Sequence, residues 1–256
     1  MGLRRNVANT ARRAACIDRA HDDKDEAVKI CGQRLSSRRA LCADLGEAPY
    51  NPKIDPANFV RKIDNPFLPF KPGTVLTYRA DTEDGVERIV VTVTDKIERI
   101  LGVDCVVVRD FVTLDGVVIE DTLDWYAQDQ RGNVWYFGEI SKTFENGDLV
   151  SLDGSWRGGV DGAKPGIVML AEPRVGNVYR QEFALGTAED YARVVSLKGR
   201  VSTPAASCAD CLVTGHFATL DATLDERKYY KRGVGFIYEV DRKTGEKLEL
   251  VSIKRP

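Results

Sequence analysis

The sequence predicts a mainly β protein, an antiparallel meander that closes into a barrel or a partly open barrel, preceded by an N-terminal α-helical hairpin. From residue 74 onward, short runs rich in Val, Ile, Thr and aromatic residues alternate with turn dipeptides such as Asp84-Gly85 and Asn146-Gly147. No helical pattern of normal length fits between these runs. About a dozen antiparallel strands must curl into a barrel or split into two sheets, and we expect a barrel.

The chain divides into three parts by composition: a helical arm at 1–48, a proline-rich linker at 49–73 and the barrel at 74–256. In the arm, Cys31-Gly32 is typical of the end of a helix, and Ser36-Ser37 is typical of the start of the next one. Together they predict a hairpin of two helices. The prolines of the linker exclude regular helix, and its apolar side chains indicate that it packs across the barrel. The expected strands cover 74–80, 87–94, 103–113, 117–128, 134–139, 142–145, 148–152, 178–183, 188–197, 211–218, 227–231, 236–240 and 247–253.

Composition excludes several classes of function. The net charge of −2 provides no basic field for nucleic acid. The longest apolar runs are far shorter than the roughly 20 residues of a membrane helix, so we expect no transmembrane segment. Two histidines among 256 residues make a histidine-rich metal site hard to assemble, and no cofactor motif is present. We therefore expect neither a metal nor a cofactor.

Residues 124–139, with the sequence DWYAQDQRGNVWYFGE, form the densest aromatic stretch. Asp129 and Gly132 suit the first and fourth positions of a type I turn, with Gly132 in the left-handed conformation of a G1 bulge. The resulting three-residue loop pairs Tyr126 with Tyr136, Trp125 with Phe137 and Ala127 with Trp135. We expect one face to point inward, carrying Leu123, Trp125, Ala127, Trp135, Phe137 and Glu139. The other face carries Asp124, Tyr126, Gln128 and Tyr136.

The glycine-rich stretch at 153–166 is not a phosphate loop, because no Gly-Lys-Ser/Thr follows it. Such a stretch is typical of a binding loop or of a crossover between two halves of a sheet. As a binding loop, it would cover an apolar or aromatic ligand against the aromatic hairpin. The candidate ligand-binding residues are Trp125, Trp135, Phe137, Tyr126, Tyr136, Trp156, Arg157 and Asp161.

Carboxylates are the candidate catalytic groups. Glu139 beside aromatic rings would have a raised pKa, unless it is merely solvated at the strand end. A hairpin loop longer by one residue would replace it by Asp124. Glu182 and Asp190 lie on consecutive strands and can share a face as an acid–base pair, although a solvent-exposed sheet face is the ordinary alternative. We expect His216 to be packed or at the surface, and 227–232 to form a surface strand.

The six cysteines divide equally between arm and barrel: Cys16, Cys31, Cys42, Cys105, Cys208 and Cys211. The two-residue gap between Cys208 and Cys211 occurs in zinc and redox sites, but no second pair or nearby histidine completes a zinc set. A structural disulfide is the better interpretation. The preferred pairings are Cys105 with Cys211 and two arm cysteines with each other. Cysteine usage of this kind favours an oxidising compartment.

Several stretches together resemble a group of uncharacterised bacterial exported β-rich proteins. They are 124–139, Gly154-Ser155-Trp156 with Pro165-Gly166-Ile167, Tyr179-Arg180-Gln181-Glu182, Lys228-Tyr229-Tyr230 with 233–235, and the entry segments 65–69 and 72–78. The resemblance covers most of residues 50–240. It implies export and a β architecture, but no activity or ligand.

The resemblance predicts a periplasmic or secreted protein. Residues 1–16 lack the apolar core of a signal peptide, so a cytoplasmic location stays open. The leading hypothesis is a non-catalytic barrel that binds a small apolar or aromatic molecule. The alternatives are a cofactor-independent lyase, isomerase or hydrolase that uses carboxylates in the barrel, and an envelope scaffold that docks a partner through the helical arm. The sequence leaves the oligomeric state open.

Overall fold

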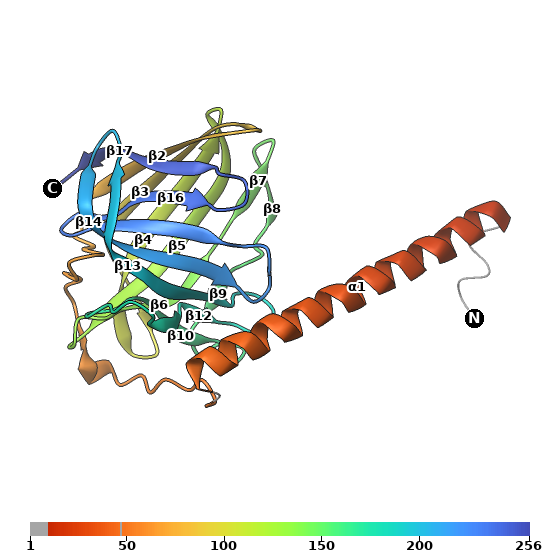
Figure 1. Cartoon of the computed structure of the whole chain (residues 1–256), viewed down its shortest axis with the longest axis horizontal. Coiled ribbons are helices and arrows are strands. Elements are labelled where there is room, and N and C mark those ends of the chain that lie inside the picture. The colour runs from red at the N-terminus through yellow and green to blue at the C-terminus, as the bar shows by residue number, and fades with distance from the viewer. Residues whose placement is uncertain (1–9, 47) are drawn as a thin grey trace.

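The protein, described by a computed structural model for residues 10–46 and 48–256, is an antiparallel β-barrel with one long helix beside it (Figure 1). The helix α1 spans Thr10–Leu45 without interruption. The prediction of a helical hairpin is therefore wrong. A glycine inside a helix costs only about 1 kcal/mol, and the helix formers around Gly32 outweigh that cost. The helix instead ends at Gly46, whose φ of 87° is the left-handed conformation of a C-terminal cap.

Each run of the barrel region that the sequence marks as a strand contains one in the structure. The strands are β2 (Val75–Thr82), β3 (Gly85–Ile100), β4 (Val103–Leu114), β5 (Val117–Asp129), β6 (Val134–Ile140), β7 (Thr143–Glu145), β8 (Asp148–Ser151), β11 (Val178–Arg180), β12 (Glu182–Phe183), β13 (Asp190–Ser202), β14 (Ser207–Ala218), β15 (Glu226–Lys231), β16 (Gly235–Asp241) and β17 (Lys247–Lys254). Three further elements are strands that the sequence does not reveal: β1 (Phe59–Val60), β9 (Trp156–Arg157) and β10 (Lys164–Met169).

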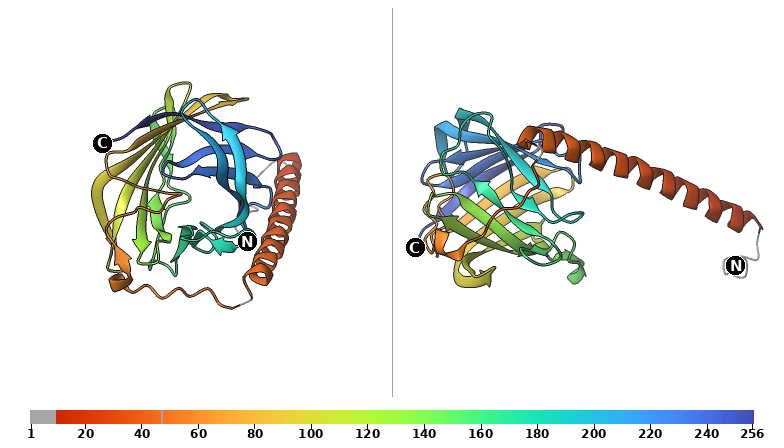
Figure 2. Two further views of the ribbon diagram at one scale, coloured as in Figure 1. Left: turned by 60° about the vertical axis from the view of Figure 1, so that its left-hand side comes forward. Right: turned by 90° about the horizontal axis from the view of Figure 1, so that it is seen from below.

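The strand β10 closes the barrel. It pairs with β6 on one side, where Gly166 lies opposite Tyr136, and with β12 on the other, where Pro165 lies opposite Glu182. From β11 the antiparallel pairing continues through β13 to β17, and β17 pairs with β2. The sheet thus returns to its starting point and forms a barrel (Figure 2), in which the ladder between β10 and the short β12 consists of two residue pairs. A Cβ on Gly166 would lie 2.3 Å from the backbone of Gln181, so this close approach requires glycine.

Residues 63–70 of the linker close one end of the barrel. Ile63, Phe67 and Phe70 are at most 8% exposed. They belong to one apolar cluster with side chains from seven strands: Val108 (β4), Val134 (β6), Met169 (β10), Tyr179 (β11), Val194 (β13), Leu212 (β14) and Tyr230 (β15). Side chains that meet so many strands of a barrel lie inside it. Burial of these rings excludes water from this end of the interior.

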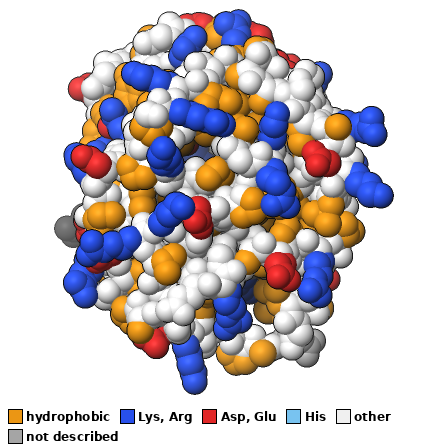
Figure 3. All heavy atoms as spheres, turned by 90° about the vertical axis from the view of Figure 1, so that its left-hand side faces the viewer, with side chains coloured by type: hydrophobic (Ala, Val, Ile, Leu, Met, Phe, Trp, Pro, Cys, Tyr) orange, Lys and Arg blue, Asp and Glu red, His pale blue; other side chains and the backbone are white. Residues whose placement is uncertain are grey.

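The helix contacts the barrel through its C-terminal part and projects away from it (Figures 1 and 2). Arg38 donates to the buried Glu189 through Nε at 2.8 Å and also through Nη2. Arg193 of β13 donates to Asp44 at 2.5 Å. Within the described residues, no helix is long and apolar enough to cross a membrane. On the barrel face away from the helix, basic side chains are more frequent than acidic ones (Figure 3).

Candidate binding site in the barrel lumen

The turn of the aromatic hairpin forms as the sequence predicts. The Gly132 amide donates to the Asp129 carbonyl at 2.9 Å, and Gly132 has a φ of 95°. Tyr126 lies opposite Tyr136, and Ala127 lies opposite Trp135. These two pairings of the sequence analysis are confirmed.

A β-bulge then changes the register. Trp125 pairs with Gly138, so the predicted pairing of Trp125 with Phe137 is wrong. Gly138 has a φ of 135°, and a Cβ there would lie 2.3 Å from the Trp156 carbonyl oxygen of β9. The strand therefore bulges at a glycine that β9 approaches closely. As a consequence Glu139 lies directly opposite Asp124.

The prediction that Trp125, Trp135 and Phe137 point inward is also wrong. Phe137 is fully buried and Trp125 is 5% exposed, but their apolar cluster includes the linker residues Ile54 and Phe59. The Phe59 ring packs edge-on against Phe137 and Trp135, at centroid distances of 5.5 and 6.1 Å. Because the linker covers the outer wall of the barrel, the outer face of this hairpin is as apolar as an inner face. We call this apolar cluster, which contains Trp125, Trp135, Phe137, Ile54 and Phe59, the outer cluster.

The opposite face of the hairpin points into the barrel. Tyr126 stacks on Tyr136 with ring centroids 4.8 Å apart, and Phe70 of the linker lies 4.9 Å from Tyr126. Tyr126 and Asp124 line a cavity of about 400 Å³ in the lumen. Aliphatic and aromatic side chains form part of its wall: Leu76, Tyr78, Ile89, Val91, Val93, Val108, Val168, Tyr230, Phe236 and Leu248. Polar and charged ones form the rest: Asp110, Asp124, Gln181, Glu182, Asp190, His216, Lys228 and Glu239.

Carboxyl groups from four strands meet at the lumen: Asp124, Glu182 and Asp190 line the cavity, and Glu139 lies opposite Asp124 without lining it. Tyr136 donates to Asp124 at 2.5 Å, which opposes the effect of burial on the Asp124 carboxyl. Burial and the neighbouring Glu139 raise the pKa of Asp124 to about 8. Burial raises the pKa of Glu139 to about 7 and the pKa of Glu182 well above its ordinary value. The pKa of Asp190 is also raised by burial.

The cluster of Asp124, Glu139, Glu182 and Asp190 therefore unites the four carboxylates that the sequence singles out. The signals were the aromatic strand pair that carries Asp124 and Glu139, and the consecutive strands that carry Glu182 and Asp190.

Two lumen residues lie where the sequence analysis does not place them. Lys228 of the expected surface strand lies inside, 3.1 Å from Glu239 and 3.5 Å from Glu226. Nothing in the sequence marks Asp110 as a site residue except its place in an apolar strand. Burial raises the pKa of Asp110 to about 7. His216 is packed, with Nε2 at 2.8 Å from the Thr214 hydroxyl, and burial lowers its pKa.

The glycine-rich stretch contributes to a second, separate hollow of about 370 Å³. Trp125, Trp156, Arg157 and Asp161 line it together with Glu139. The Arg157 guanidinium lies over the Trp125 ring at 5.1 Å and donates to Glu98 at 2.7 Å. Trp156 stands between the two sites, because its ring also packs edge-on against Tyr136 at 5.3 Å. Trp135 and Phe137 line neither hollow.

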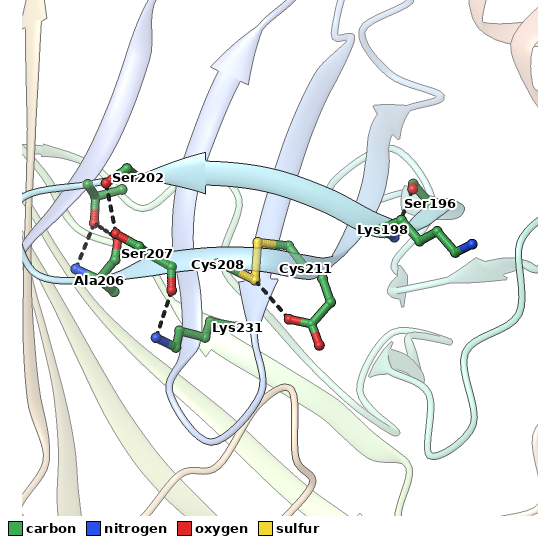
Figure 4. Close-up of a disulfide and its surroundings, with 10 residues drawn as sticks. Ser196, Lys198, Ser202, Ala206, Ser207, Cys208, Cys211 and Lys231 are labelled. Carbon is green, nitrogen blue, oxygen red and sulfur yellow. Dashed lines mark hydrogen bonds between the residues drawn. A yellow bond between two sulfur atoms is a disulfide. The ribbon is translucent and has the colours of Figure 1, made fainter.

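One disulfide joins Cys208 and Cys211 within β14 (Figure 4). The preferred pairing of Cys105 with Cys211 is wrong: Cys105 is a free, buried thiol on β4, and β4 and β14 are not neighbours in the sheet. Cys16, Cys31 and Cys42 are free and exposed. The expected bond between two of them cannot form within one straight helix, because even Cys31 and Cys42 are separated along it by about 16 Å at 1.5 Å per residue.

Comparison with known proteins identifies no family for this chain. No protein-family model matches the chain, and no curated protein does either. A solved structure of a putative lipoprotein from Parabacteroides distasonis is similar to it, with 12% sequence identity and a TM-score of 0.39, over 73% of this chain and 98% of that one. A similarity of this degree has no bearing on the fold or the function.

Proposed function

We propose that the barrel binds a small molecule with an apolar or aromatic body in its lumen, without chemical conversion. The observation that carries the proposal is the cavity of about 400 Å³ between the linker segment 63–70 and the carboxyl cluster. Ligand pockets usually have volumes of about 300–1,000 Å³ and combine apolar walls with a few polar groups. The aliphatic side chains of the cavity wall would contact the apolar body of such a ligand. Asp124 and Glu182 would bind a polar group at one end of it.

We further propose that the protein is exported. The disulfide between Cys208 and Cys211 supports this, since disulfides persist in oxidising compartments and are rare in the cytosol. The resemblance of segments such as 124–139 to exported β-rich proteins supports it as well.

The binding proposal is tested by isothermal titration calorimetry with 4-bromobenzyl alcohol, 4-bromobenzylamine, indole and lauric acid. We expect at least one probe to bind. Val91→Phe fills the lumen cavity and should abolish this binding, whereas Val117→Phe, at a position 57% exposed, should leave it unchanged. Near-ultraviolet circular dichroism shows whether Val91→Phe keeps its fold. Binding to none of the four probes, or binding that survives in a folded Val91→Phe variant, would contradict the proposal.

A second candidate function is acid–base catalysis without a cofactor. It is favoured by the Asp124 and Glu139 pair, which lie opposite each other with pKa values of about 8 and about 7. Two buried carboxyl groups of this kind can share one proton near neutral pH, so that one acts as acid and the other as base. A turnover with a bell-shaped pH profile that Glu139→Gln abolishes would support this function. Unchanged turnover in Glu139→Gln would remove Glu139 from it.

A further inference from the structure

The lumen cavity has more acidic than basic side chains in its wall. Lys228 is the lysine that lines it, and its ammonium group is held by Glu239 at 3.1 Å and by Glu226 at 3.5 Å. In the part of the chain that the structure describes, Asp124 and Glu182 form no ion pair with any basic side chain. The outer surface away from the helix has the opposite character, with basic side chains in excess (Figure 3). The excess of carboxyl groups is therefore particular to the interior.

One oxygen atom among these carboxyl groups has no hydrogen-bond partner. Glu182 is 8% exposed, and its Oε2 is buried without a donor. The Oδ1 of Asp110, across the cavity on β4, is in the same condition. A buried carboxyl oxygen without a donor costs about 1–3 kcal/mol or more, and protein interiors rarely leave one so. Both residues line the cavity, so a bound molecule with hydrogen-bond donors would satisfy them.

Aromatic rings line the same cavity as these carboxyl groups. Tyr126 lines the cavity next to Asp124, and Tyr230 and Phe236 line it from β15 and β16. The faces of aromatic rings attract cations with about 0.5–2 kcal/mol each. Carboxylates together with aromatic faces form the usual setting for an ammonium group, whereas an anion would be repelled by the carboxylates.

We infer that the ligand of the lumen is a small organic cation, an amine or quaternary ammonium group on an aromatic or apolar body. The inference rests on the proposed function, because it requires that the lumen binds a ligand. A neutral hydroxyl would satisfy the free oxygens of Glu182 and Asp110, but only a cation would in addition be attracted by the ionised forms of the carboxyl groups around it. The ammonium group lies among Asp124, Glu182 and Asp190, and the apolar body lies against Val91 and Phe236.

Binding of a cation here is coupled to release of protons. Asp124, with a pKa of about 8, holds a proton at neutral pH in the free protein, and burial raises the pKa of Glu182 as well. A bound cation favours the ionised forms of both groups. Binding therefore tightens as the pH rises from about 6 to about 8. The charged or titratable groups that line the cavity or act on these two carboxyl groups are Tyr78 (β2), Asp110 (β4), Glu120 and Tyr126 (β5), Tyr136 and Glu139 (β6), Asp190 (β13), His216 (β14), Lys228 and Tyr230 (β15) and Glu239 (β16). His216 stays neutral because its pKa is lowered, and Lys228 stays charged because Glu226 and Glu239 hold it.

The test compares 4-bromobenzylamine with 4-bromobenzyl alcohol, which have nearly the same shape and differ in charge. Calorimetry at about pH 8 should show the amine binding at least about tenfold more tightly. This preference should shrink at about pH 6, and titrations in buffers of different ionisation enthalpy should reveal protons released with the amine alone. Glu182→Gln and Asp124→Asn should each reduce the preference. Asp148→Asn, at an exposed carboxylate on β8, is the matched control and should leave it unchanged.

The outcomes separate the inference from the proposed function. If the alcohol binds as tightly as the amine at both pH values, the lumen binds a ligand but the inferred charge is wrong. If the amine is preferred equally by the wild type and by folded Glu182→Gln and Asp124→Asn variants, the cation is not held by this cluster. If neither probe binds, nor indole nor lauric acid, then the proposed function fails and the inference fails with it.

Discussion

The two faces of one hairpin show what decides whether an aromatic residue builds the fold or borders a binding site. On the outer face Phe137 is fully buried beneath Phe59 of the linker, in a cluster of apolar side chains. On the inner face Tyr136 has its hydroxyl group 2.5 Å from Asp124 and its ring on Tyr126, which borders an open cavity. The outer rings pack in one cluster with the linker residues Ile54 and Phe59. The inner rings, together with carboxyl groups, leave space for another molecule.

This comparison predicts that the two faces respond to different perturbations. Changes on the outer face should lower the free energy of unfolding without altering what the folded protein binds. Changes on the inner face should alter binding and the dependence of stability on pH.

The largest expected effect is on the outer face. Phe137→Ala removes a fully buried ring, and such a change costs about 3–5 kcal/mol of unfolding free energy because a cavity remains. Ile140→Ala, on the same strand at a position 38% exposed, should cost far less. Urea denaturation measures both. Equal losses for the two variants would mean that the linker does not seal the outer cluster.

The next largest effect is on the inner face, where the buried carboxyl groups should make the unfolding free energy depend on pH. The pKa of Asp124 is about 8 in the folded protein and near 3.8 in the unfolded chain. Because the folded protein keeps this proton up to about pH 8 and the unfolded chain releases it near pH 4, the contribution of Asp124 to stability is fully present below about pH 4 and is lost progressively until about pH 8. The unfolding free energy should therefore fall between about pH 6.5 and pH 8, a window that lies at or above the ordinary pKa of histidine.

A pKa difference of one unit corresponds to about 1.4 kcal/mol, and we expect the fall to be at least about 2 kcal/mol. Asp124→Asn should make this fall smaller, although Glu139 and Asp110, with pKa values of about 7, still contribute to it. Asp148→Asn should leave the fall unchanged. Chemical denaturation at several pH values checks both. A wild-type profile that is flat or rises in this window would contradict the burial of the carboxyl cluster.

A smaller effect is expected at the contact between tyrosine and carboxyl group. Tyr136→Phe removes the hydrogen bond to Asp124, at a cost of about 1–2 kcal/mol. Because this bond lowers the pKa of Asp124, its loss should raise that pKa further, which nuclear magnetic resonance titration of the carboxyl carbon would detect. Tyr238→Phe, at a half-buried tyrosine of β16, is the control and should not move it. An unchanged pKa in Tyr136→Phe would show that the bond is absent in solution.

The smallest effect is again on the outer face. The indole Nε1 of Trp135 donates to Asp129 at 2.9 Å, at the turn of the hairpin. Trp135→Phe keeps a ring against Phe59 and loses this hydrogen bond, so we expect a loss of about 1 kcal/mol and unchanged ligand affinity. Denaturation and calorimetry measure the two quantities. A loss of affinity in this variant would place the ligand on the outer face.

The strands of the barrel were predictable because their signals are local. Alternation of apolar and polar residues, with turns such as Asp129 to Gly132, determines a hairpin from a few neighbouring residues. The closing strand β10 was not predictable, because Pro165-Gly166 in a glycine-rich stretch is typical of a loop. Gly166 is needed because the backbone of Gln181 lies against it, and this contact is not visible in the local sequence.

The inner and outer faces were assigned wrongly for a related reason. A strand shows which residues share a face, but Ile54 and Phe59 of the linker decide which face is covered from outside. The bulge at Gly138 then moves Glu139 to the side of Asp124, which alternation alone does not show. The carboxyl candidates could be named from the sequence, whereas their convergence with Asp110 and Lys228 depends on how β4 and β15 curve around the lumen.

The central claim is that the lumen, and not the outer aromatic face, binds the ligand. The most direct test is a crystal structure of the protein with 4-bromobenzylamine, in which anomalous scattering locates the bromine. The account predicts a bromine peak inside the barrel near Val91 and Phe236, with the ammonium group beside Asp124 and Glu182. A peak confined to the hollow formed by Trp125 and Arg157, with an empty lumen, would contradict it.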